Sequence, residues 1–164
     1  MQTTGVSRYG LSGPFGNTRE LFEQALEQYA EGMVKQSFLR LLVPGASLDH
    51  VRAIFDERVA DMCCGEENKR CLFIHTAMEL APQDEELRGV LQRFMKRMSK
   101  AFAIGLDSAK GRGEVAQDVD VDAAGELLTS TMFGLAVLGR TGFPKATLDG
   151  IVDSTLESIQ AGGK

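Results

Sequence analysis

Apolar residues recur at intervals of three and four positions through most of this sequence, and Gly or Pro interrupts the pattern at short breaks. Such spacing places the apolar side chains on one face of an α-helix, and that face must be buried against neighbouring elements. No stretch with the period of a β-strand competes with this pattern. A chain of 164 residues is long enough for one domain with a sizeable apolar core. The sequence therefore predicts an all-α fold, a bundle of helices around one core.

Six helices are expected between the breaks. The first begins at Asn17, where Asn17 and Glu20 form a capping box, and it continues to about Leu42 before Pro44. The later helices are expected at about 47–64, with Ser47 as the cap, and at 71–81, 83–110, 121–140 and 146–160. The segment 71–81, CLFIHTAMELA, is apolar around almost its whole circumference, which predicts a buried central helix.

Composition and charge exclude several classes of protein. No apolar run approaches the roughly 20 residues of a membrane span, and no signal-peptide pattern begins the chain, so we expect a cytoplasmic protein without a membrane partner. The net charge of −5 argues against wholesale nucleic-acid binding, but the first 19 residues contain Arg8 and Arg19 and no acidic residue. The three cysteines are too few for a disulfide framework, which favours reduced thiols.

The stretch GVSRYGL near the start has the parts of a DNA-recognition helix. Gly5 supplies a turn, Ser7 a helix cap, and Arg8 and Tyr9 the exposed first turn of a short helix. In a helix-turn-helix protein, this end of the second helix points into the major groove. From periodicity alone, any short capped helix has the same pattern.

The longer string GVSRYGLSGPFGNTRELFEQALEQY resembles the TetR family of bacterial repressors, at the junction between the DNA-binding domain and the first ligand-domain helix. The matching positions are Gly5, Val6, Ser7, Leu11, Phe15, Gly16, Leu21 and Phe22. The order and lengths of the later helices agree with the helical effector domain of that family. The resemblance implies DNA contacts by Ser7, Arg8, Tyr9 and Thr18, although the family commonly has a phosphate-contacting lysine where Thr18 stands.

The resemblance also implies a division of the chain. In the family, two further helices precede the recognition helix and orient it, whereas only MQTT precedes Gly5 here. We therefore expect a partial helix-turn-helix over residues 1–16 and a ligand-binding and dimerisation domain over residues 17–164. An operator is the expected partner of a full-length form, and DNA binding by this chain is expected to be weak or absent.

The last two helices carry wide apolar stripes that exceed what one small body needs to cover. Such a surplus predicts a symmetric homodimer built from a helix bundle, with intramolecular core as the alternative. The residues expected at the interface are Leu128, Leu135, Leu138, Leu148, Ile151, Val152, Thr155 and Ile159.

Soft and aromatic side chains gather in the central helices and predict a pocket for a small apolar or aromatic effector. The expected lining residues are Met62, Phe73, His75, Met78, Met98, Phe102 and Phe133. His75 would be the polar group that orients the bound molecule. Ordinary core packing is the alternative for most of these residues.

Cys63, Cys64 and Cys71 lie close to His75 in the sequence and are candidates for a redox or electrophile sensor. Their spacing matches no C-x-x-C site, so small structural cysteines are favoured over zinc, and no metal or cofactor is expected. No catalytic constellation is recognisable, which argues against an enzyme. The resemblance thus implies a ligand-responsive repressor; the alternative is a dimeric ligand-binding or interaction module that does not bind DNA.

Overall fold

The computed structural model describes residues 18–64 and 72–162 of the chain. Every regular element in these two ranges is a helix, which confirms the all-α prediction. The helices are α2 (Thr18–Met33), α3 (Leu48–Cys64), α4 (Leu72–His75), α5 (Glu85–Gly111), α6 (Val121–Arg140) and α7 (Lys145–Glu157). Short turns of other helical types follow α2, namely η1 (Val34–Phe38) and η2 (Leu39–Leu41), and follow α4, namely η3 (Thr76–Leu80) and η4 (Ala81–Gln83).

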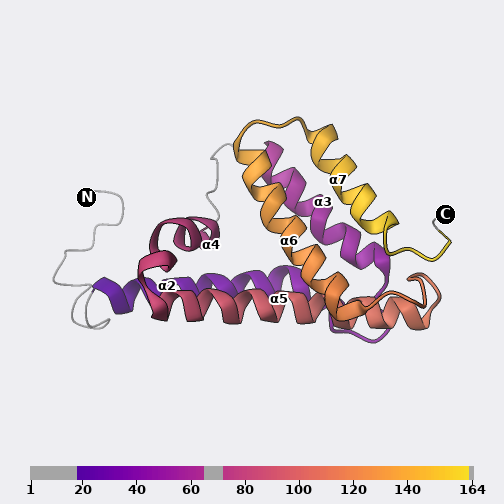
Figure 1. The fold of residues 1–164 in the computed structure, drawn as a ribbon, viewed down its shortest axis with the longest axis horizontal. Helices are drawn as coiled ribbons and strands as arrows, with labels where there is room; N and C mark the ends of the chain where they lie inside the picture. Colours follow the sequence, from indigo (N-terminus) through magenta and orange to yellow (C-terminus); the bar gives the residue numbers. More distant parts are fainter. Residues whose placement is uncertain (1–17, 65–71, 163–164) are drawn as a thin grey trace.

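The two helices α2 and α5 lie side by side along the long axis of the molecule and run in the same direction (Figure 1). At their beginning, the Arg19 guanidinium bonds the Asp84 carboxylate at 2.9 Å, just before α5. At their far end, Leu41 packs against Gly105, where an added Cβ would lie 3.1 Å from a Leu41 methyl group. The helices α3, α6 and α7 stand together at an angle to this pair, and α4 lies near the beginning of α2 and α5 (Figure 1).

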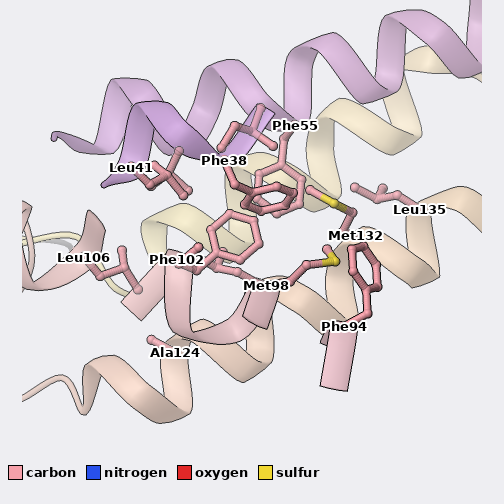
Figure 2. Close-up of a cluster of buried hydrophobic side chains, with 14 of the residues drawn as sticks. Phe38, Leu41, Phe55, Phe94, Met98, Phe102, Leu106, Ala124, Met132 and Leu135 are labelled. Atoms are coloured by element: carbon pink, nitrogen blue, oxygen red, sulfur yellow. The ribbon is translucent and has the colours of Figure 1, made fainter. Parts of the chain in front are cut away.

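The core is centred where these two groups of helices cross. Phe102 of α5 packs edge-to-face on Phe38, with ring centroids 5.2 Å apart, and stacks on Phe55 of α3 at 5.8 Å. Figure 2 shows this aromatic cluster together with Met98 and Met132. All three rings are almost completely buried, so the cluster joins η1, α3 and α5 into one core.

The helices α5 and α6 approach each other at backbone distance. A Cβ added to Gly125 of α6 would lie 2.4 Å from the Ser99 carbonyl oxygen of α5. The Ser99 hydroxyl donates to Thr129 Oγ1 at 3.0 Å, and the Thr129 hydroxyl donates in turn to the Gly125 carbonyl at 2.9 Å. Glycine is required at this crossing because no side chain fits between the two backbones.

Two carboxylates at helix beginnings act as expected of caps. The Asp84 carboxylate accepts bonds from the backbone N–H groups of Glu86 and Leu87, and Asp120 does the same at the start of α6. The predicted capping box at Asn17 lies outside the described residues. The predicted cap Ser47 is different, because its hydroxyl lies 2.7 Å from His50 Nδ1.

Glu114, in the loop between α5 and α6, caps α3 from a distance. Its carboxylate accepts a bond of 2.9 Å from the Leu48 backbone N–H and a bond of 2.7 Å from Arg112 Nε. These two donors, with Leu48 the larger influence, hold the pKa of the Glu114 carboxyl below its ordinary value.

We expect Glu114→Gln to lower the free energy of unfolding by about 1 kcal/mol at neutral pH, the usual effect of losing a charged cap. Because the folded-state pKa is lowered, the stabilisation is complete above the unfolded carboxyl pKa of about 4.3. It is lost as the pH falls through the lower folded-state value. Urea unfolding of both proteins from pH 7 to pH 3 measures this; a difference that stays constant down to pH 3 would contradict the assignment.

Candidate functional site

A cavity of about 610 Å³ lies between α2, α3, α5 and α6. Its wall consists of Tyr29, Gly32, Met33 and Gln36 from α2 and η1, Arg58, Asp61 and Met62 from α3, Met98 from α5, and Met132, Phe133, Ala136, Gly139 and Arg140 from α6. This volume is in the range of small-molecule sites in proteins. An occupant would therefore contact four helices at once.

Methionines form most of the apolar wall. Met98 and Met132 are buried and anchored in the core, whereas Met33 and Met62 are half-buried. Methionine has a flexible, polarisable side chain, so a wall of this type adapts to apolar ligands of different shapes. Apolar packing against a bound molecule is the first property of the cavity.

Arginines contribute the second property, positive charge. The Arg58 Nη2 group donates to Ser37 Oγ at 2.9 Å, and its Nη1 atom lies 3.7 Å from the Asp61 carboxylate. Arg58 Nε is buried without a hydrogen-bond partner. Arg58 is thus only partly paired within the protein.

Arg140 is held from outside the cavity by a short relay. Its Nη1 group lies 2.8 Å from His75 Nε2, and His75 Nδ1 lies 3.2 Å from a Glu79 carboxylate oxygen. A guanidinium can only donate, so His75 Nε2 is the acceptor of this bond, and His75 Nδ1 faces Glu79. The histidine thus positions an arginine of the wall and is not itself part of it.

Three of the predicted ligand-binding residues, Met62, Met98 and Phe133, line the cavity. Phe102 lies in the aromatic core, and Phe73 stacks on Phe94 with ring centroids 3.9 Å apart. His75 and Met78 also lie outside the wall, and Met78 is 75% exposed.

The prediction of a buried central helix at 71–81 is wrong for the described part of that segment. The chain there is a four-residue helix followed by the wider turn η3 and the tighter turn η4. Phe73, Thr76 and Ala81 are buried, whereas Met78 and Leu80 are exposed. The segment covers one side of the molecule instead of passing between the central helices. One of its faces packs against α5, and the opposite face is exposed to solvent.

The sequence interpretation missed the polar part of the wall. Arg58, Asp61 and Met62 follow one another at helical spacing and share one face of α3, which was the available signal. The link between Arg140 and His75 spans 65 positions, and no local pattern indicates it.

The predicted dimer residues are mostly core of the single chain. Five of the eight are buried within it: Leu128, Leu135, Leu148, Val152 and Ile159. Leu138, Ile151 and Thr155 are half-buried. The buried five have little surface left for a contact between two copies, which favours the alternative of intramolecular core for them; the predicted interface itself stays a prediction.

A different apolar surface remains on α6. Leu127, Ser130, Gly134 and Val137 are all exposed and follow one face of this helix at three- and four-residue spacing. Contrary to the expectation from the sequence, α6 is long and apolar enough to pass for a membrane span, with a mean hydropathy of 1.3 over its most apolar 18 residues. Only 33% of those residues are buried in the structure. The helix packs within the bundle, so its uncharged outer stripe is a surface that needs a cover.

The remaining predicted sites fall largely outside the described residues. Ser7, Arg8, Tyr9 and Cys71 lie there, and the side chains of Thr18 and Cys64 are not described either. Cys63, at the end of α3, is a free thiol and is exposed, unlike the buried structural cysteine that was favoured. Within the two described ranges, no three His, Cys, Asp or Glu side chains form a group that could hold a metal ion.

Comparison with known proteins identifies the family. The sequence model of the tetracyclin repressor-like C-terminal domain matches residues 51–155, which include α4, α5 and α6 and most of α3 and α7. The chain belongs to the TetR family of transcriptional regulators. This confirms the family resemblance of the N-terminal string, and it makes the protein a transcriptional regulator and not an enzyme.

Two similar proteins illustrate the relationship. The uncharacterised HTH-type transcriptional regulator YezE of Bacillus subtilis (strain 168) is 32% identical over 156 residues, which cover 94% of this chain and 80% of YezE. A cysteine mutant of the TetR family regulator CifR, solved with double-strand operator DNA, has the same fold. Its TM-score is 0.78 at 23% identity, over 93% of this chain and 80% of the CifR chain.

Proposed function

We propose that this TetR family regulator is a homodimeric, ligand-responsive repressor, in which a small molecule in the cavity alters DNA affinity by moving α2. The observation that carries the proposal is the composition of the cavity wall. Tyr29 and Met33 of α2 face the same space as Met98 of α5 and Phe133 of α6. A ligand that fills this space contacts both the core and α2, the described helix nearest to the predicted recognition residues.

The helix α2 is the wall best able to move. Among its described side chains Leu26 and Ala30 are buried, whereas α5 buries residues along most of its length. Its beginning is held to α5 by the exposed ion pairs of Arg19 with Asp84 and Glu86. Exposed ion pairs contribute little to stability, so a ligand with different affinities for two α2 positions can shift their populations.

DNA is the proposed partner of this movement. The CifR relative was solved with operator DNA, and we propose an operator for the present regulator, acting in the cytoplasm. Tilting α2 in each subunit would change the spacing of the two DNA-reading helices of a dimer. That spacing must match the half-sites of an operator, so ligand and DNA binding would be coupled.

The outer stripe of α6 is the proposed dimer contact. It combines the exposed apolar residues Leu127 and Val137 with the small residues Ser130 and Gly134 between them. Small residues let two helices approach closely, and among the described residues no atom of another element lies within 4 Å of the Cβ position of Gly134. Gly150 and Ser154 are exposed small residues of α7, the helix that follows α6 and packs against it.

A thermal-shift screen of small aliphatic and aromatic molecules tests the ligand site. We expect binders to stabilise the protein, by about 2.7 kcal/mol at a hundred times Kd. Ala136→Leu places a larger side chain in the cavity wall and should abolish the shift. The matched variant Ala123→Leu, on an exposed position of the same helix, should keep it. Binders that stabilise the Ala136→Leu protein as well as the wild type would place the ligand elsewhere.

A further inference from the structure

The charges in the cavity wall are unequal. Two guanidinium groups, Arg58 and Arg140, face one carboxylate, Asp61, among the described lining residues. The described wall therefore carries one net positive charge. A neutral or cationic occupant would leave this excess uncompensated in a space that is largely apolar.

Arg58 has unused hydrogen-bonding capacity. Its one short bond is to Ser37, and the distance of 3.7 Å to Asp61 exceeds that of a hydrogen bond. Asp61 is 70% exposed, so water screens this ion pair and it holds the guanidinium only weakly. Arg58 Nε is covered by protein atoms and has no hydrogen-bond partner. If Arg58 rotated toward the cavity, this N–H could donate to an acceptor on a bound molecule.

The apolar wall begins one helical turn from this guanidinium. Met62 follows Arg58 by four positions on α3, and both line the cavity. Met98 and Met132 line it from the core side. An acceptor group at Arg58 can therefore be continuous with a hydrocarbon or aryl body lying among the methionines.

We infer that the cavity takes an amphipathic monocarboxylate whose carboxylate pairs with Arg58. A planar carboxylate matches the two parallel N–H groups of a guanidinium, and it neutralises the net charge of the wall. Arg140, fixed by His75, adds positive charge without being the main partner. The inference rests on the proposed ligand site and specifies the chemistry of its occupant.

Decanoate, decanol and decylamine are the probes, because they share one hydrocarbon chain and differ in charge. Each is titrated below its aggregation concentration, at physiological salt, and binding is followed by thermal shift and calorimetry. We expect decanoate to bind about tenfold or more tighter than decanol, and decylamine to bind weakest, since hydrogen bonds to charged groups have effects of that size.

Two substitutions should move decanoate affinity in opposite directions. Arg58→Gln should raise the decanoate Kd about tenfold, whereas Asp61→Asn should lower it by removing the competing carboxylate. Neither should change decanol binding. Arg58→Lys, which keeps the charge and loses the planar fork, should lie between wild type and Arg58→Gln. The control Arg97→Gln removes an exposed charge of α5 that does not line the cavity, and it should have no effect.

The results separate the two proposals. One result would overturn the inference of a carboxylate ligand and leave the proposed ligand site intact. In that result, decanoate and decanol bind equally, Arg58→Gln does not change their binding, and Ala136→Leu abolishes it. If Arg58→Gln does not fold, Asp61→Asn alone must still strengthen decanoate binding, and an unchanged Kd would overturn the inference. If neither these probes nor the wider screen stabilises the protein, both proposals fail.

Discussion

Val137→Glu is expected to convert the proposed dimer into a folded monomer. Val137 is 47% exposed and is the last residue of the uncharged stripe on α6. Two copies that meet through this stripe would each bury an unpaired carboxylate, whose desolvation costs several kcal/mol. The dimer Kd should therefore rise about a hundredfold or more, which analytical ultracentrifugation at micromolar concentration will measure.

Gln92→Glu is the matched control, because it introduces the same charge at an exposed position of α5. It should remain dimeric with wild-type affinity. Leu127→Glu, on the same stripe as Val137, should behave like Val137→Glu, and circular dichroism will show whether each variant is folded. A wild-type protein that is monomeric at micromolar concentration would contradict the proposed contact, as would a Val137→Glu protein that stays dimeric.

Phe102→Ala should lower the free energy of unfolding by about 3–5 kcal/mol, the usual cost of removing a fully buried aromatic ring. The ring packs on both Phe38 and Phe55, and it has no exposed surface. Such a loss is a large part of the stability of an ordinary domain. Urea unfolding, with and without a bound ligand, will measure it.

Phe133→Ala provides the contrast. Phe133 is half-buried and lines the cavity, so its removal should destabilise the free protein less than Phe102→Ala and should weaken ligand binding more. A loss below about 1 kcal/mol for Phe102→Ala would be inconsistent with a tightly packed core at this position.

The helices could be predicted because their signals are local. The segment 121–140 has a capping aspartate at Asp120 and apolar residues at helical spacing, and α6 has those bounds. The chain also remains helical from Thr18 to Leu41, as the periodicity indicates, although the hydrogen-bond pattern changes after Met33. These features depend on neighbours within one or two helical turns.

The burial of each face could not be predicted in the same way. Nothing local shows that Phe73 faces Phe94 while Met78 faces solvent, because burial depends on which helix lies opposite. The proposed dimer contact on α6 could not be predicted from the local sequence either. The most apolar residues of α6, such as Leu128 and Leu135, are used by the chain's own core, and the exposed stripe contains Ser and Gly, which a search for large apolar residues passes over.

The cavity could be predicted in part for a related reason. Met62, Met98 and Phe133 share the soft or aromatic character expected of a ligand site, and they line it. Arg58 and Arg140 have the side chains of ordinary surface positions, and their place in the wall follows only from the fold, which brings α3 and α6 to the same cavity as α2. Charge in a pocket is therefore a property of the fold that composition does not indicate.

A crystal structure of the protein with a binder from the screen tests the proposed mechanism most directly. We predict the bound molecule in contact with Met62, Met98 and Phe133, and α2 displaced along α5 relative to the free protein, with the Arg19 to Asp84 pairing changed. A molecule bound outside this cavity, or one bound inside it with α2 and its contacts to α5 unmoved, would contradict the proposed link between ligand and DNA.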